Sequence, residues 1–296
     1  MRGLSTTPQT LKVLTAVCAL GAMAACGASN ATSGGGTEPA TTGQNQGPDP
    51  EASAGRDEGA PTVSRCTVQV TEDGRARGTT VYVYTAGTLT EVVAEDPESA
   101  RRFTTSYTYR EGGSAVEVEK SNNQGGEPAT ALMRYEGGRS GGPVVGERLE
   151  GESVVERITW WFDGQERPLK RNHEWLPTTA ERTLGLEGRA EGDVCRYDDS
   201  GRPVEFDMSL VQERVLEVRY HYEGDAGFPT TISERHVAEG NDGETGPAAT
   251  VEILSEDPAD LTVVWANAPT RATHYRGDCR AVFFPAVCSA ASAPGR

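Results

Sequence analysis

An alternation of large side chains that ends in a glycine turn recurs six times along this chain. The copies begin at Tyr82, Tyr107, Met133, Trp160, Cys195 and Tyr220, with spacings of 25, 26, 27, 35 and 25 residues. Side chains at i and i+2 lie on one face of a β-strand, and glycine supplies the positive φ that a tight turn needs. The pattern therefore predicts a repeated β-hairpin.

The segments after these turns have the composition of returning strands. Several begin with proline, which is tolerated as the first residue of a strand, and these start at Pro143, Pro168, Pro203 and Pro229. We expect an all-β domain over residues 62–296, in which antiparallel hairpins form a large twisted or curled sheet, half-barrel or sandwich-like. A diverged further copy is expected at 250–254 and 262–265. Short helices are expected at 96–98 and 176–184, where proline suits the first helical position.

One copy, Cys195-Arg-Tyr197-Asp198-Asp-Ser-Gly201-Arg202, resembles the YD repeat of the RHS family. The repeats of that family are β-hairpins that wind into long sheets or shells. The resemblance therefore implies hairpin architecture for the mature domain, although six copies are too few for an enclosing shell. The toxin-delivery function of that family is not carried over.

The first 25 residues are typical of an export signal, because a basic start precedes a short apolar stretch that ends in small residues. The stretch ends in Met23-Ala24-Ala25-Cys26, which resembles the bacterial lipobox, although Met23 stands where leucine is usual. The resemblance implies cleavage before Cys26, lipidation of its thiol and anchoring to the membrane. Cys18 is a poorer candidate because Val17 precedes it. The alternative is an ordinary secretory signal in which Cys26 is incidental.

Residues 26–61 are predicted to be the lipidated cysteine and a disordered linker. After Cys26 this segment contains no Leu, Ile, Val, Met or aromatic residue, so it cannot bury enough apolar surface to offset its ordering entropy. A flexible linker of this length has a root-mean-square reach of roughly 30 Å. We therefore expect a module displayed away from the membrane of the cell envelope. In a Gram-negative cell, Gly27 implies delivery to the outer membrane by the sorting rule of lipoproteins.

The composition of the chain is strongly acidic, with 44 acidic and 28 basic residues and a formal net charge of −16. Binding to a phosphate backbone requires clustered lysine and arginine, so nucleic acid is excluded as a partner. Tight docking on anionic lipid is disfavoured for the same reason. The expected partners are the membrane, through the lipid anchor, and an envelope protein or apolar ligand.

Four cysteines follow the linker, and an oxidising compartment favours disulfides between them. These are Cys66, Cys195, Cys279 and Cys288. Of the three possible pairings, we favour Cys279–Cys288, which closes a short loop, together with Cys66–Cys195. A zinc site built from all four is the rival, but the chain has no CxxC pair.

Few motifs in the sequence indicate catalysis or metal binding. The four histidines, His173, His221, His236 and His274, lack metal-ligand spacing. Ser140 lies in a Gly-x-Ser-x-Gly string, but a strand is expected after it where a nucleophile elbow needs a helix. The segments 198–201 and 241–244 contain several side-chain oxygens that are able to bind calcium, but neither segment has the spacing of a known calcium loop. Both are expected to be turns.

Aromatic side chains are the remaining candidates for a ligand site. Trp160, Trp161, Tyr220 and Tyr222 are able to line a groove, but core packing is the default expectation for them. No catalytic residue, metal site or cofactor is therefore assigned.

Three functions remain open from the sequence. The first is a non-enzymatic envelope lipoprotein that serves as a structural or interaction module. The second is a carrier that holds a lipid or another apolar ligand in a curled sheet, which requires a large apolar pocket. The third is a hydrolase of envelope polymers, which requires a cleft with two carboxylates or a cluster centred on a histidine or on Ser140. We favour the first.

Overall fold

The computed structural model describes residues 61–110, 114–125, 127–137, 143–151, 153–177, 188–210, 213–237 and 247–289. The predicted signal, Cys26 and the linker up to residue 60 lie outside the described residues. The strands are β1 (Val63–Glu72), β2 (Arg75–Thr85), β3 (Thr88–Asp96), β4 (Arg101–Arg110), β5 (Ala115–Asn122), β6 (Ala129–Glu136), β7 (Val144–Glu150), β8 (Ser153–Phe162), β9 (Pro168–Trp175), β10 (Arg189–Tyr197), β11 (Pro203–Leu210), β12 (Glu213–His221), β13 (Thr231–His236), β14 (Pro247–Glu256), β15 (Ala259–Trp265) and β16 (Ala268–Gly277). They are followed by α3 (Arg280–Phe283) and a 3-10 turn, η3 (Ala286–Cys288).

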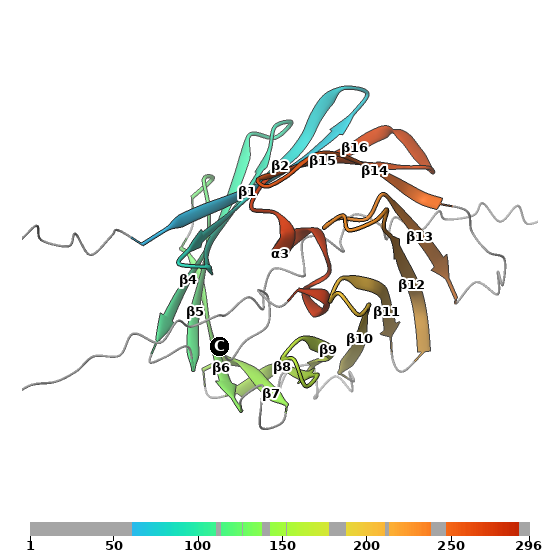
Figure 1. Cartoon of the computed structure of the whole chain (residues 1–296). Coiled ribbons are helices and arrows are strands. Elements are labelled where there is room, and N and C mark those ends of the chain that lie inside the picture. Colours follow the sequence, from blue (N-terminus) through green and yellow to red (C-terminus); the bar gives the residue numbers. More distant parts are fainter. Residues whose placement is uncertain are drawn as a thin grey trace, which may run out of the picture.

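The strands form one closed antiparallel barrel (Figure 1). Each strand pairs with its neighbours in sequence, and β16 pairs with β1 from Cys66 opposite Gly277 to Glu72 opposite Arg271. The predicted all-β antiparallel class is confirmed, whereas the half-barrel or sandwich-like sheet is corrected to a closed barrel. Closure gives partners to the backbone groups that two open edges would leave unpaired.

The sequence repeat corresponds to the ends of alternate strands. The six copies end β2, β4, β6, β8, β10 and β12, and the next strand returns after each turn. The diverged copy lies in β14 and β15. The first large residue of every copy is buried, from Trp160 and Cys195 at 0% exposure to Tyr82 at 8%. The alternation therefore marks the side chains that face the interior of the barrel.

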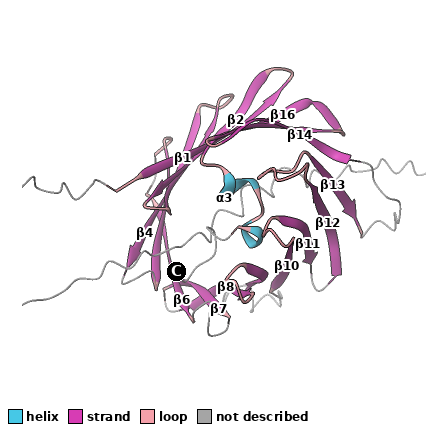
Figure 2. Cartoon of the chain, in the orientation of Figure 1, coloured by secondary structure: helices cyan, strands magenta, loops and turns pink. Residues whose placement is uncertain are grey.

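The C-terminal segment 278–289 fills part of that interior. Figures 1 and 2 show α3 and η3 inside the ring of strands. Phe284 packs edge-to-face against Tyr220 of β12, with ring centroids 5.3 Å apart, and Phe283 packs similarly against Phe228 and Tyr275. We call this segment the plug. A barrel of this many strands is too wide for its own side chains to fill, so the plug completes the core.

Two disulfides attach the plug to the wall, and their pairing corrects our expectation. Cys66 of β1 is bonded to Cys279, and Cys195 of β10 is bonded to Cys288. The favoured Cys279–Cys288 loop is wrong because these residues lie at opposite ends of the plug. Each is directed to a different strand of the barrel. The rival zinc site is also excluded, since all four sulfurs are used in disulfides.

The predicted helix at 96–98 is a turn. The Asp96 side chain accepts hydrogen bonds from the backbone N–H groups of Glu98, at 2.9 Å, and Ser99, at 3.3 Å. These are the bonds of a helix N-cap, but β4 begins at Arg101, so the segment between β3 and β4 is too short for a helix. Most of the other expected helix, at 176–184, lies outside the described residues.

Candidate functional site

A cluster of charged side chains lies on the inner wall of the barrel, on four neighbouring strands. Strand registers place Arg148 of β7 opposite Glu156 of β8, and His173 of β9 opposite Glu191 of β10. One level nearer the plug, Arg171 of β9 is opposite Asp193 of β10, and the cross-strand neighbour of Arg171 on its other side is the buried Trp160. We call these six ionisable residues the inner cluster. Charges are costly in an interior, so a group of ionisable side chains on the inner wall is a candidate functional site.

Glu156 is the centre of one half of the inner cluster. Its side chain is 4% exposed, Arg148 Nε donates to Glu156 Oε2 at 2.6 Å, and His173 Nε2 bonds to Oε1. Burial opposes ionisation, but the hydrogen bonds and charges of His173 and Arg148 outweigh it, so the pKa of Glu156 lies below its usual value. The carboxylate is therefore held ionised.

The other half combines an ion pair with an unpaired carboxylate. Arg171 pairs with the buried Asp193, and burial still raises the pKa of that carboxyl. Burial and the neighbouring charge of Asp193 raise the pKa of Glu191, against the smaller opposing effects of His173 and Arg171. No ion pair to Glu191 is formed by the side chains that the structure describes. Glu191 is therefore the carboxylate of the inner cluster that has no ion pair with a described side chain.

An aromatic pair borders the cluster. The ring centroids of His173 and Trp175 lie 3.8 Å apart with the planes tilted by 33°. Both residues face the interior, and Trp175 keeps partial exposure. An aromatic pair therefore lies beside Glu191, which is opposite His173.

The pH dependence of stability tests the bond network of Glu156. Its lowered folded pKa means that its contribution is present above the ordinary glutamate pKa and is lost as the pH falls through the folded value. We expect Glu156→Gln to lower the free energy of unfolding by about 2 kcal/mol at pH 7, with the difference shrinking below pH 4. The measurement is urea unfolding at several pH values.

Glu150→Gln is the matched control for that test. Glu150 also binds Arg148, at 2.8 Å, but its side chain is 57% exposed, so little change is expected. Equal effects of the two substitutions would contradict a special role for the buried carboxylate.

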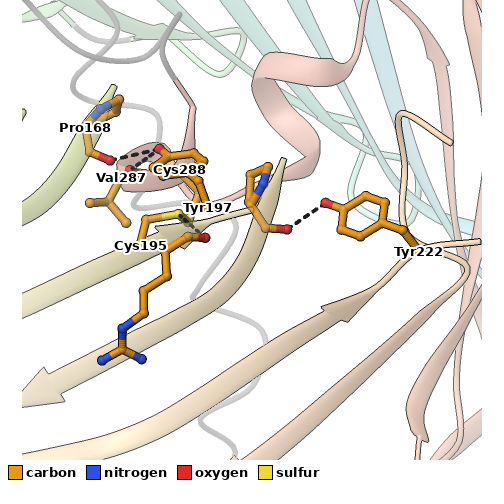
Figure 3. The surroundings of a disulfide bond; sticks show 8 residues. Pro168, Cys195, Tyr197, Tyr222, Val287 and Cys288 are labelled. Atoms are coloured by element: carbon orange, nitrogen blue, oxygen red, sulfur yellow. Dashed lines mark hydrogen bonds between the residues drawn. A yellow bond between two sulfur atoms is a disulfide. The ribbon is translucent and has the colours of Figure 1, made fainter. Parts of the chain in front are cut away.

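The predicted aromatic candidates separate into inner and outer residues. Trp160 and Tyr220 belong to the hydrophobic core. The expectation of core packing is therefore confirmed for these two residues. Trp161 is on the opposite face of β8 from Trp160 and lies beneath Lys170, whose Nζ is 5.0 Å from a ring centroid. The Tyr222 hydroxyl donates to the Pro203 carbonyl at 2.7 Å (Figure 3).

The YD-like copy forms a turn closed by an ion pair. Asp198 accepts from the backbone N–H of Arg202 at 2.9 Å and from its Nε at 2.8 Å. Asp163 and Arg167 repeat both bonds one hairpin earlier, at 2.9 and 2.7 Å. These carboxylate oxygens are engaged by arginine, which explains the 198–201 segment as turn chemistry.

A tyrosine of the following hairpin completes each of these two turns. Arg167 stacks over the ring of Tyr197 at 4.7 Å, and Arg202 over that of Tyr222 at 4.6 Å. Tyr197 donates to the Pro168 carbonyl at 2.8 Å beside the Cys195–Cys288 bridge, as Figure 3 shows. The turns are therefore structural elements that hold consecutive hairpins together.

The remaining predicted candidates are dispersed. His274 lies between Thr71 and Thr262, at 3.1 and 3.0 Å, and His221 bonds to Ser233 at 3.0 Å. Ser140 and the segment 241–244 lie outside the described residues. Within the described ranges, no group of three or more His, Cys, Asp or Glu side chains is arranged to hold a metal ion.

The inner cluster was missed in the sequence, although a signal for it exists. Counting back two residues at a time from Cys195 gives Asp193 and Glu191, and from Trp160 the same step reaches Glu156. Those positions share the face of the large repeat residues, so they are directed inward. Charged residues at inward positions were the available indication.

Comparison with known proteins leaves the family open. No family model and no curated protein matches the chain. Among solved structures, it is similar to a porin-like protein from Bacteroides uniformis at 10% identity, over 72% of this chain and 96% of that one, with a TM-score of 0.33. A likeness this low carries no argument about function. In the described part of the chain, no helix is long and apolar enough to cross a membrane.

Proposed function

We propose that this chain is an exported lipoprotein that displays a plugged, water-facing barrel at the cell envelope as a non-enzymatic interaction module. The observation that carries the proposal is the charged exterior of the barrel, together with the apolar core that the plug forms with the inner wall. Transmembrane β-barrels have the reverse arrangement, with an apolar band outside and a polar lumen.

The outer face of β10–β13 carries the clearest ladder of charges. Arg196 pairs with Glu205, while Glu217 accepts from Arg219 at 2.7 Å and from Arg235 at 2.6 Å. An arginine that faces lipid near the bilayer midplane costs about 2–4 kcal/mol. These outward-facing ion pairs therefore support the proposal that the outer face of β10–β13 is in contact with water.

The plug supports a closed module rather than a pore. It is bonded to β1 at one end and to β10 at the other, and its Phe284 and Val287 are buried within the barrel. Both disulfides also suit an oxidising compartment outside the cytoplasm, which is in keeping with export.

The carrier alternative receives less support. The plug fills the part of the barrel interior that is lined by apolar side chains, so this part is not open to an apolar ligand. A depression of about 330 Å³ lies instead over β4–β7, where Arg110, Glu117 and Leu132 help to line it. A lipid site is expected to be predominantly apolar, and this surface is mixed.

The hydrolase alternative requires a free acid–base pair beside a cleft. The inner cluster does gather carboxylates around His173, but Glu156 and Asp193 are both engaged by arginine. Within the described residues this leaves Glu191 without a second free carboxylate in the cluster. We therefore propose binding rather than hydrolysis.

Fractionation of cells tests the lipid anchor. With Cys26→Ala, the protein is expected to move from the membrane pellet to the soluble fraction, because the acylated thiol is lost. Cys18→Ala is the matched control and is expected to leave the protein in the pellet. Pelleting of both variants would refute the anchor.

A further inference from the structure

We propose that the plug holds the barrel closed at the junction of β13 and β14, and that freeing one end of the plug opens the barrel sideways at this junction. The inference goes beyond the proposed function, because it assigns a conformational change to the barrel. It does not depend on the lipid anchor.

The junction of β13 and β14 is the shortest strand pairing among the described residues of the barrel. The three matched positions are Thr231–Thr250, Ile232–Ala249 and Ser233–Pro247, with a bulge after the second. Every other pair of neighbouring strands is matched over five or more positions. Pro247 also has no N–H to donate. Fewer ladder hydrogen bonds therefore join β13 to β14 than join the other described strands.

Side chains strengthen the other side of β13 more than this junction. On the outer face, Arg235 of β13 donates to Glu217 of β12 at 2.6 Å. On the inner face, Ile232 is opposite Ala249 across the junction, and an alanine methyl provides little contact area. β13 is therefore held more firmly to β12, with which it is matched from Leu216 opposite His236 onward.

The plug is bonded to the barrel on both sides of this junction. Around the ring, β10 to β13 lie on one side of it, and β14, β15, β16 and β1 lie on the other. Cys288 is bonded to Cys195 of β10, and Cys279 is bonded to Cys66 of β1. Figure 1 shows the plug running through the interior between these two parts of the wall. The two disulfides therefore limit how far the two sides of the junction can separate.

The aromatic rings of the plug also contact both sides of the junction. Phe283 packs edge-to-face against Phe228, in the connection before β13, and against Tyr275 of β16, with both pairs of ring centroids 5.2 Å apart. Phe284 packs in the same way against Tyr220 of β12. Such pairs contribute about 0.5–1.5 kcal/mol each beyond the burial of their area. The plug therefore supplies packing between two sides that a short ladder joins.

Freeing the plug at β10 removes one of its two covalent attachments and leaves the other in place. The barrel is then expected to open where the ladder is shortest, because opening there breaks the fewest backbone hydrogen bonds. An open junction presents the unpaired N–H and C=O groups of two strand edges. Exchange of the amide hydrogens of β13 therefore reports the opening.

Hydrogen–deuterium exchange of the full mature chain tests the proposal. Cys195→Ala combined with Cys288→Ala frees the β10 end of the plug, while the bridge from Cys66 to Cys279 keeps the other end attached. We expect exchange of the β13 amides to accelerate at least tenfold more than exchange of the β4 and β5 amides, which lie outside the β10–β16 arc. A tenfold difference corresponds to about 1.4 kcal/mol. Equal acceleration in β13 and in β4 and β5 would overturn the proposal.

Two matched engineered disulfides separate local opening from a general loss of stability. In the chain without the Cys195–Cys288 bridge, Thr231→Cys with Thr250→Cys joins β13 to β14, and Thr104→Cys with Ser121→Cys joins β4 to β5 at positions that are also opposite each other. The first pair is expected to slow β13 exchange at least tenfold more than the second pair does. Equal effects of the two pairs on β13 would contradict a local opening.

The same two pairs of substitutions in the otherwise unchanged chain keep the proposal testable if the double alanine variant does not fold, which circular dichroism checks. There the Thr231 and Thr250 pair is again expected to slow β13 exchange more than the Thr104 and Ser121 pair does. Equal slowing would show that β13 and β14 do not separate locally, and the proposal would then be wrong.

Discussion

Replacing Cys66 and Cys279 by alanine is expected to lower the free energy of unfolding by about 5 kcal/mol. The bridge joins residues 213 positions apart, so its removal restores a large loop entropy to the unfolded chain. The bond also ties the plug to β1, next to the seam where β1 meets β16. The measurement is denaturant unfolding of the double variant beside the wild type, both under oxidising conditions.

Peptide mapping under non-reducing conditions serves as the control for this prediction. The fragments that contain Cys66 and Cys279 should be linked, as should those that contain Cys195 and Cys288. A linked Cys279–Cys288 fragment would contradict the plug as described. Loss of less than about 1 kcal/mol in the double alanine variant would show that packing and the remaining Cys195–Cys288 bridge are enough to hold the plug.

Phe284→Ala is expected to have the second largest effect, a loss of about 4 kcal/mol in the free energy of unfolding. The ring is 6% exposed and packs edge-to-face against Tyr220 and Phe283, with centroids 5.3 and 5.0 Å away. Truncation removes this contact area and leaves a cavity between the plug and the wall. The disulfides on both sides of the residue limit how far the plug can relax into that space.

Phe103→Ala is the matched control because it removes the same atoms from the inner face of β4. Phe103 is 47% exposed, so the expected loss is below about 1.5 kcal/mol. Thermal unfolding of both variants measures the contrast. Similar losses for the two substitutions would mean that the plug does not form a well-packed core with the barrel.

Only one property of the inner cluster could be predicted from the sequence, which is the direction in which its side chains point. The parity of Asp193 and Glu191 relative to Cys195 is readable in the sequence. Their meeting with His173 depends on the β9–β10 register, which follows a connection between Trp175 and Arg189. Register is determined by pairing along the whole strand and by turn geometry, so the spacing of charged residues could not reveal which of them meet.

The sequence by itself determined the class of the protein's local structure. The alternation of large residues and the glycine turns specify antiparallel hairpins, and the six large residues that start the repeats all became buried. Both signals are local, because the alternation of side chains along a strand and the turn preference of glycine operate within a few residues. The predicted lipid anchor at Cys26 has the same local origin.

Only the tertiary structure decided the closure of the ring, the use of the C-terminal segment as a plug and the pairing of the cysteines. Each joins parts of the chain that are remote in sequence, such as Cys66 and Cys279. The hairpin pattern is equally compatible with an open sheet, because it repeats without marking either edge. Closure becomes favourable when β1 and β16 satisfy each other's free backbone groups and the plug fills the space that their pairing encloses.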